Sequence, residues 1–400
     1  MAMTSEATRE ARARRALKRD GLIVRKDRAR AWNIDHHGGY MVIGLGHIAQ
    51  AAVLPAFRHA RKNSRLVALV SGDEEKRSKL SKKYRCDACS YEELEQCLAR
   101  EDVDAVYICE PNDKHAEFAI RCARAGVHVL CEKPLAISEE ECRRMIEACD
   151  EAGVKLMTAY RLHFEPANLE VVKLIGQGKI GDLRFFSSDF SYQVKKDNIR
   201  VSAARGGGPL WDIGVYCVNA ARYCFRSDPI EVFALRADRP DDPRFAEVHE
   251  GMSATLKFPG ERLATFNVSF GAAATSTYRI VGTKGDICLD NAYEYVGERE
   301  MTVTVQDKSR TRTFGMTDQF AAELIAFSDA VLNDGEIEPD GEEGLRDVRI
   351  IDALLRSARD SKPIRLSWTP RRRRPEPSQR IRRPKVREPE LVDAEGAVAD

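Results

Sequence analysis

Short apolar runs alternate with longer amphipathic stretches from residue 36 to residue 160. A continuous apolar run is typical of a strand that is buried on both faces, as in a parallel sheet covered by helices. The amphipathic stretches have the length of the crossover helices that parallel strands need. We therefore predict a doubly wound α/β domain. Its strands are expected at Tyr40–Gly44, Leu66–Val70, Ala105–Cys109, Val127–Cys131 and Lys155–Ala159, and its helices at Ala49–His59, Glu74–Tyr84, Glu92–Leu98, His115–Ala125 and Glu139–Ala152.

The pattern changes after residue 160, where apolar and polar residues alternate along most runs. Such alternation is typical of strands with one buried face, and turn signals such as Pro259-Gly260 separate the runs. We therefore predict an α+β domain with an antiparallel meander. Its strands are expected at Leu183–Tyr192, Glu231–Arg236, Met252–Phe258, Leu263–Phe270, Thr277–Gly282, Gly285–Asp290 and Met301–Thr304, and its helices at Pro166–Leu174, Gln319–Leu332 and Gly341–Ala358.

Both ends of the chain are basic, although the formal net charge is only +1. Residues 1–35 contain ten Lys or Arg and five Asp or Glu, and residues 371–400 contain nine and six. The body between them is therefore mildly acidic, which argues against a nucleic-acid-binding protein. The segment after Trp368 has no apolar periodicity. We predict a basic N-terminal arm over 1–35 and a disordered basic tail over 370–400.

No run approaches the roughly 20 apolar residues of a membrane-spanning helix. The pair Arg14-Arg15 is not followed by the apolar stretch of an export signal. Cys86-x-x-Cys89 lacks a second pair at zinc spacing, so we expect no bound metal. Several of the eleven cysteines lie in apolar runs, as reduced thiols in protein cores do. These features predict a cytoplasmic protein that does not enter membranes, with core thiols at Cys109, Cys131, Cys217 and Cys224.

A glycine-rich turn, GLGHIA at residues 44–49, follows the first predicted strand. Gly44 permits the tight turn, Gly46 lets a pyrophosphate approach the backbone, and Ala49 allows the helix to pack closely on the strand. The helix N-terminus adds a positive dipole. The alternative is a tight turn with no ligand, but its position between a strand and a helix favours dinucleotide binding. The expected contacts are Gly44, Gly46, His47 and Ile48.

The end of the second predicted strand indicates which nicotinamide nucleotide binds. NAD enzymes usually place Asp or Glu there to hold the ribose 2′-hydroxyl, whereas this chain has Ser71. Lys76 follows in the next helix, and a hydroxyl with a nearby ammonium suits the 2′-phosphate of NADP. Two alternatives stay open: Asp73 could turn inward and favour NAD, and Lys76 could belong to a solvated helix face. We predict NADP as the cofactor, with NAD second.

The sequence Cys131-Glu132-Lys133-Pro134 directly follows another predicted strand. Ligands bind sheets of this kind at the carboxyl ends of their strands. Lys133 can donate to a substrate hydroxyl, and Pro134 restricts the lysine to extended backbone geometry. The alternative is a surface loop, since Lys-Pro pairs are frequent.

A third motif is GGGPLWDIGVYCVN at residues 206–219. Pro209 fits the first turn of a helix, which would place Asp212 and Tyr216 four residues apart on one face. A carboxylate and a phenol there could bind a sugar hydroxyl and move its proton, and an adjacent ammonium stabilises a phenolate. A capping Asp and a packed Tyr are the alternative.

Together these motifs resemble the glucose–fructose oxidoreductase/inositol dehydrogenase family. The resemblance covers residues 38–368 in order, through GLGHIA, PNDKHAEFAI (111–120), CEKP (131–134), AYRLHF (159–164), GGGPLWDIGVY (206–216) and GEEGLRDVRIIDALL (341–355). The glucose–fructose oxidoreductase branch is the most similar. Its 2′-phosphate site is matched by VSG (70–72), Lys76 and Tyr91, and Tyr216 stands where many family members have His.

The resemblance implies a Rossmann domain over 36–160, then a substrate-binding and oligomerisation domain over 161–369 with an open, mostly antiparallel sheet. It implies an NADP-dependent enzyme that transfers hydride between the nicotinamide and a carbon of a sugar, such as glucose or xylose, and a homodimer or homotetramer formed through that sheet. Lys133, Asp212 and Tyr216 fall on the family's catalytic positions. Further cofactor contacts are expected at Tyr91, Pro111, Asn112, His115, Glu132 and Lys133, and sugar contacts at Lys133, Arg161, Asp212 and Tyr216, with His163 near the pocket.

One departure from the family is Glu110, which places an acid beside the expected nicotinamide position. Two function classes stay open: a sugar oxidoreductase with Tyr216 as the base, and a sensor that binds nucleotide and sugar without catalysis. The intact set of Lys133, Asp212 and Tyr216 favours the enzyme. Within the enzyme class, a second sugar could reoxidise a cofactor that never leaves the protein.

Overall fold

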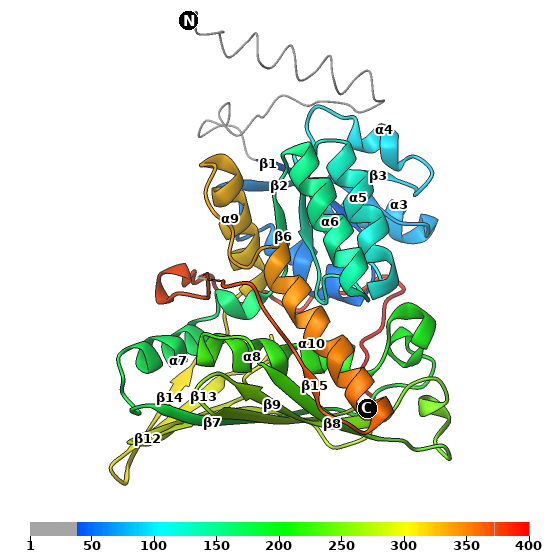
Figure 1. Ribbon diagram of the computed structural model, residues 1–400. Helices are drawn as coiled ribbons and strands as arrows, with labels where there is room; N and C mark the ends of the chain where they lie inside the picture. The colour runs from blue at the N-terminus through cyan, green and yellow to red at the C-terminus, as the bar shows by residue number, and fades with distance from the viewer. Residues whose placement is uncertain (1–37, 372, 400) are drawn as a thin grey trace, which may run out of the picture.

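The structure is a computed structural model in which residues 38–371 and 373–399 are described. Figure 1 shows two sheets, the upper with helices on both faces and the lower with helices on the face toward the upper domain. The predicted basic arm, residues 1–35, lies outside the described residues. No described helix has both the length and the apolar content to cross a membrane.

The first domain contains a parallel six-stranded sheet in the order β3-β2-β1-β4-β5-β6. The order reverses between β1 and β4, so the predicted doubly wound fold is confirmed. The predicted helix Ala49–His59 is instead a π-helical turn and a short α-helix, because Pro55 has no N–H to donate within a regular helix. The elements are β1 (Gly38–Ile43), η1 (Ala49–Val53), α2 (Leu54–Ala56), β2 (Ser64–Val70), α3 (Glu74–Tyr84), β3 (Asp87–Cys89), α4 (Leu94–Leu98), β4 (Ala105–Ile108), η2 (Asn112–Lys114), α5 (His115–Arg124), β5 (His128–Cys131), α6 (Glu139–Ala152) and β6 (Leu156–Thr158).

The second domain contains a nine-stranded sheet in the order β14-β13-β12-β11-β7-β10-β9-β8-β15. β7 and β10 pair in parallel and the other neighbours are antiparallel, which confirms an open, mostly antiparallel sheet. The strands are β7 (Leu183–Ser191), β8 (Glu231–Ala237), β9 (Gly251–Phe258), β10 (Arg262–Ser269), β11 (Thr275–Gly282), β12 (Gly285–Asp290), β13 (Arg299–Val305), β14 (Lys308–Phe314) and β15 (Ile364–Arg365).

Three helices, α7 (Pro166–Gly176), α8 (Val215–Phe225) and α10 (Gly341–Asp360), cover one face of this second sheet (Figure 1). The alternating pattern of most strands buries apolar residues beneath these helices, as in Phe186 and Phe266. The opposite face carries exposed apolar side chains at Phe185, Leu235 and Leu263. The helices separate this sheet from the first domain, so residues of α8 lie between the two sheets.

The helix α9 (Gln319–Leu332) belongs to the first domain by packing, although its sequence lies in the second half of the chain (Figure 1). The hydroxyl of Tyr40 in β1 and that of Ser64 in β2 lie 2.7 Å and 2.8 Å from the Ser328 hydroxyl. Phe320, Leu324 and Phe327 share a core with the apolar residues of β1 and η1. A division at residue 160 therefore leaves out part of the first domain's core.

The segment after Thr369 corrects the prediction of a disordered tail. This segment has no apolar periodicity, but its arginines meet carboxylates that are buried between α8 and α10. Arg374 is 4% exposed and pairs with Asp228 at 2.8 Å and Glu343 at 3.0 Å. Arg371 pairs with Glu338 at 2.6 Å and with Glu343 at 3.0 Å. Charge pairing in the core, which composition does not reveal, fixes the start of the tail.

The cysteines divide into a bonded pair and nine free thiols. Cys109, Cys131, Cys217 and Cys224 are free and buried, as predicted. The chain brings β3 beside α4, and Cys89 in β3 forms a disulfide with Cys97 in α4, which sequence analysis did not predict.

Candidate active site

Lys133 lies directly after β5, at the carboxyl edge of the parallel sheet, and points toward the second domain. Its Nζ donates to the backbone oxygen of Asp212 at 2.8 Å and lies 3.3 Å from Asp212 Oδ1. Burial opposes the lysine charge, but interaction with the neighbouring acidic groups, including Tyr216 and Asp212, outweighs it and raises the pKa of Lys133. A charged lysine therefore joins the two domains at this edge.

Asp212 lies in the π-helical turn η6 (Leu210–Gly214), immediately before α8. Its Oδ2 accepts from the Tyr192 hydroxyl at 2.7 Å and from Arg200 Nε at 2.9 Å. Burial alone would raise the pKa of Asp212, yet the charges of Arg200 and Lys133 hold it well below its usual range. Asp212 is thus a permanent carboxylate that fixes the lysine rather than a group that exchanges protons.

Tyr216 is in the first turn of α8, and its hydroxyl has a cation for a neighbour. Arg161 Nη2 donates to that hydroxyl at 3.0 Å. Lys133 Nζ lies 4.8 Å and Arg161 Cζ 5.0 Å from the centre of the Tyr216 ring. Two positive charges therefore border this phenol.

Tyr192 is a second phenol in the same cluster, with the opposite environment. Its hydroxyl donates to the Asp212 carboxylate, and burial together with that negative charge raises the pKa of Tyr192 well above its ordinary value. Tyr192 can hold Asp212 in place but cannot readily give up its proton. The site thus contains one phenol that faces cations and one that faces an anion.

Arg161, from the 3₁₀ turn η3 (Arg161–His163), is buried and held by more than Tyr216. It donates to Gln319 Oε1 at 2.5 Å and to the backbone oxygen of Tyr293. Sequence analysis predicted Arg161 as a sugar contact but missed Tyr192 and Arg200. The alternation along β7 points Tyr192 inward, and this was the one available signal. Arg200 lies in an irregular loop with no pattern to mark it.

The glycine turn has the shape that a pyrophosphate needs. Gly44 has φ of +89°, and a Cβ there would lie 2.8 Å from the Cys109 backbone, so a larger residue would not fit. A Cβ placed on Gly46 would meet nothing within 4 Å, so the backbone is open for close approach of a ligand. His47 is half-buried beside this opening, and Ile48 follows at the start of η1.

Polar groups at the end of β2 fit a 2′-phosphate. Asp73 caps α3 by accepting from the Lys76 backbone N–H at 3.0 Å, so it does not turn inward as an NAD-binding acid would. Ser71 is 6% exposed, and Lys76 Nζ lies 3.6 Å from Asp73 Oδ2. Arg77, which the sequence analysis did not name, donates to the Ser71 backbone oxygen at 2.6 Å. The 2′-phosphate would therefore meet two cations beside a hydroxyl.

Glu110 has a structural partner in Tyr91. The Tyr91 hydroxyl donates to Glu110 Oε1 at 2.5 Å, and its ring lies against Gly72. Burial raises the pKa of Glu110. The two side chains therefore form a hydrogen-bonded pair between the ends of β2 and β4, and the tyrosine ring lies beside the expected nucleotide.

Three other predicted cofactor contacts lie in the loops around the site. His115 is fully buried, with Nδ1 2.8 Å from the Pro134 oxygen and Nε2 2.8 Å from the Glu110 oxygen. Asn112 donates to the Gly206 oxygen at 2.9 Å, and Pro111 precedes it at the start of η2. Both nitrogens of His115 thus face backbone carbonyls, which leaves none for a ligand.

Glu132 turns inward from the sheet edge. Its Oε1 and the Oε2 of Glu323 both lie within hydrogen-bond distance of the Tyr107 hydroxyl, at 3.0 Å and 3.1 Å. Burial raises the pKa of both carboxyls. A proton retained on Glu323 would supply the second hydrogen bond, because one phenol donates only once.

His163 belongs to the buried charge cluster rather than to the predicted sugar pocket. It lies 2.8 Å from Asn219 Oδ1 and 3.2 Å from Glu338. Among the described residues, His163, Glu338 and Glu343 bring ligand-type atoms within 4.8 Å of one another. Arg371 and Arg374 already pair with these carboxylates, so a metal cation would meet positive charge there.

The family model of oxidoreductases with an NAD-binding Rossmann fold matches residues 39–160, and the C-terminal α/β domain of the same family matches residues 172–366. The chain belongs to this family. It is the glucose–fructose oxidoreductase/inositol dehydrogenase family that the sequence motifs resemble.

Several relatives with assigned activities act on sugars. A D-xylose 1-dehydrogenase (NADP⁺) of Haloferax volcanii is 31% identical over 329 residues, covering 81% of this chain and 98% of its own. An aldose–aldose oxidoreductase from Caulobacter crescentus has a structure with a TM-score of 0.79 and 36% identity, covering 82% of this chain and 100% of its own. A 3-ketoreductase from Actinomadura kijaniata, solved with NADP, has a TM-score of 0.74 and 29% identity over 80% of this chain and 98% of its own. The protein is an NAD(P)-dependent oxidoreductase of this sugar-dehydrogenase family.

Proposed function

We propose that the protein oxidises an aldose at its anomeric carbon, with NADP as the hydride acceptor and Tyr216 as the base. The contrast between the two phenols carries this proposal. Tyr216 OH accepts a hydrogen bond from Arg161 with Lys133 over its ring, whereas Tyr192 OH donates to Asp212. A base must lose its own proton before it can take another, and adjacent positive charge favours that loss.

Each group in the cluster has a distinct part in the reaction. Tyr216 takes the proton of the sugar hydroxyl while the carbon loses hydride, and the product is a lactone. Lys133 donates to that hydroxyl or its neighbour, and the Asp212 carboxylate keeps the ammonium in position. Arg161 stabilises the phenolate. When bound, the dinucleotide supplies the acceptor carbon for the hydride. A non-catalytic sensor would need none of these proton-transfer groups.

NADP is proposed over NAD because Ser71, Lys76 and Arg77 gather at the end of β2 while Asp73 caps the helix. The names of two relatives support the same choice, since the Haloferax volcanii enzyme is described as NADP-dependent and the Actinomadura kijaniata enzyme was solved with NADP.

The proposed function is tested by incubating the purified protein with NADP and a panel of aldoses while dihydronicotinamide absorbance is recorded. We expect reduction of NADP with at least one aldose and much slower reduction of NAD. Absence of reduction with every aldose, by a protein that binds NADP, would favour the sensor. A second arm adds a ketose or another aldose to the reduced protein and measures whether it reoxidises the cofactor.

We also propose that two copies associate through the uncovered face of the second sheet. Phe185, Leu235 and Leu263 lie on β7, β8 and β10, and their side chains are between 44% and 58% exposed on that face. Exposed apolar side chains that share one face of a sheet are typical of a protein–protein contact. Sedimentation analysis should give a dimer or tetramer, and Phe185→Asp should shift it toward monomer. A monomeric wild type would contradict this assembly. We further propose a cytoplasmic location, because nine of the eleven cysteines are free and seven of these are buried, although Cys89 and Cys97 are bonded to each other.

A further inference from the structure

The last ten described residues lie over the face of the first domain that carries the glycine turn. Lys83 Nζ donates to the Glu390 oxygen at 2.9 Å. The Gln50 side chain forms two hydrogen bonds with the backbone of Val392, donating to its oxygen at 2.8 Å and accepting from its N–H at 2.7 Å. Gln50 is 1% exposed and directly follows the glycine turn in η1, so the tail is fixed at the start of this helix.

The next residues cross the expected path of the dinucleotide. Asp393 Oδ2 lies 3.4 Å from Lys76 Nζ, at the proposed 2′-phosphate position. Gly396 lies against His47, since a Cβ added to this glycine would be 3.4 Å from the imidazole Nε2. The tail therefore passes from the lysine of the 2′-phosphate site to the histidine of the glycine turn.

The tail then attaches to the second domain, just beyond β7. Lys195 N–H donates to the Ala397 oxygen at 2.8 Å, and Ala399 N–H donates to the Gln193 oxygen at 2.7 Å. Val398 forms an antiparallel bridge with Val194. In Figure 1 the red end of the chain descends from the upper to the lower domain along this course.

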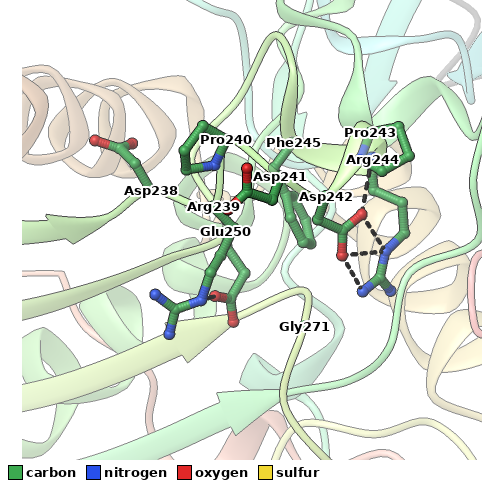
Figure 2. Close-up of a pocket in the computed structure, with 10 residues that line it drawn as sticks. All are labelled: Asp238, Arg239, Pro240, Asp241, Asp242, Pro243, Arg244, Phe245, Glu250 and Gly271. Atoms are coloured by element: carbon green, nitrogen blue, oxygen red, sulfur yellow. Dashed lines mark hydrogen bonds and ion pairs between the residues drawn. The ribbon is translucent and has the colours of Figure 1, made fainter.

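The attachment point is itself rigidly held. Arg244 donates to Gln193 Oε1 at 2.7 Å and to the Val194 oxygen at 3.2 Å. Figure 2 shows Arg244 fixed by Asp242 at the edge of a cavity of about 740 Å³, which is lined by Asp238, Arg239, Pro240, Asp241, Asp242, Pro243, Arg244, Phe245, Glu250 and Gly271. Two of the ion pairs at this cavity, Arg239 with Glu250 and Arg244 with Asp242, lie between residues that line it, so we assign the cavity a supporting role for the tail.

We propose that residues 390–399 form an outer wall of the dinucleotide site and slow the release of the bound nucleotide. This inference rests on the proposed function, because it requires a dinucleotide between Lys76 and Lys133. The tail covers the site without filling it, since the space over Gly46 stays open. Asp393 is 71% exposed and can move away from Lys76 when a phosphate arrives. The matched family range ends at residue 366, so this wall is an addition to the family domain.

The test compares the full-length protein with a truncation that ends at Pro389. Each is loaded with NADPH, excess NADP is added, and the loss of bound dihydronicotinamide fluorescence gives the release rate. We expect the release rate to increase by about tenfold or more without the wall. At least two hydrogen bonds between the tail and the second domain must break before the tail can open. A variant of equal length with residues 390–400 in reverse order should release NADPH as fast as the truncation.

A matched pair of point variants covers the case in which the truncation does not fold. Ala399→Pro removes the N–H that donates to Gln193, whereas Ala399→Gly keeps it. We expect faster release in the proline variant only. Equal release rates in every variant would refute the wall while leaving the proposed function intact. Slower release after truncation would refute it as well, because the tail would then compete with the nucleotide. A full-length protein that fails to bind NADPH would overturn both proposals.

Discussion

Replacing Tyr216 by Phe separates a catalytic base from a packed tyrosine, and Tyr192→Phe provides a control in the same cluster. Both substitutions remove one hydroxyl and keep the ring. Tyr216→Phe removes the oxygen that Arg161 binds at 3.0 Å, and Tyr192→Phe removes the donor that holds Asp212 at 2.7 Å. If the environments of the two phenols decide their chemistry, only the first change removes the proton acceptor.

The turnover of the two variants should differ by at least tenfold. Loss of a general base lowers turnover by about 10²–10⁴, which equals about 3–5.5 kcal/mol in activation free energy. Tyr192→Phe should cost about tenfold, because a hydrogen bond to a charged group contributes about 1.5 kcal/mol at the lower end and Arg200 and Lys133 still hold Asp212. Folding stability should fall by only about 1 kcal/mol in Tyr216→Phe, since Arg161 keeps Gln319 and the Tyr293 oxygen as acceptors.

The assay is turnover at saturating NADP and aldose, with NADP affinity and the thermal transition measured on the same preparations. We expect unchanged NADP affinity in both variants, which would locate the loss in the chemical step. Turnover of Tyr216→Phe within a few-fold of wild type would refute the assignment of the base. Equal losses in the two variants would refute the argument from the charges around each phenol.

Three further predictions concern the cofactor and the buried charges. Lys76→Ala should weaken NADP binding by about 1.5–3 kcal/mol and barely change NAD binding, as titration of each nucleotide would reveal; equal losses would contradict the 2′-phosphate site. Arg374→Ala should lower the free energy of unfolding in urea by about 3 kcal/mol, because Asp228 and Glu343 lose a buried partner; no change would mean that the tail does not dock. Burial would raise the pKa of Glu343, but neighbouring arginines hold it at about 2, below its ordinary 4.5. The ionised Glu343 side chain therefore contributes fully to folding stability above pH 4.5, and this contribution is lost as the pH falls toward 2. Wild type should therefore lose more stability than Arg374→Ala over that pH range, and parallel pH profiles would contradict this.

Periodicity predicted most of the fold because most strands of the first sheet are buried on both faces and the long helices have an apolar side. Periodicity did not predict strands that are held mainly by backbone pairing or that are very short. β14 consists almost entirely of exposed polar and basic residues and is held by backbone pairing with β13, so no apolar pattern marks it. β3 has three residues, too few for any period.

The candidate site was predicted in part for a similar reason. Motifs located Lys133, Asp212 and Tyr216, because short strings at strand and helix ends identify such positions. They did not identify Arg200 or Tyr192, whose roles depend on a loop and a strand end that meet Asp212 only in the folded chain. Nor could they reveal that the tail's arginines pair with Asp228 and Glu343, since long-range pairing of charges leaves no local pattern.

The packing of α9 on the first sheet affects how the protein can be made. Chains are synthesised from the N-terminus, and domains generally fold as units when their sequence is complete. Here the strands that end at Thr158 leave the ribosome long before Phe320, Leu324 and Phe327, which cover part of their apolar surface. That surface stays uncovered while the strands β7 to β14 are synthesised. A chain terminated after residue 160 would therefore be prone to aggregate rather than form a small nucleotide-binding protein.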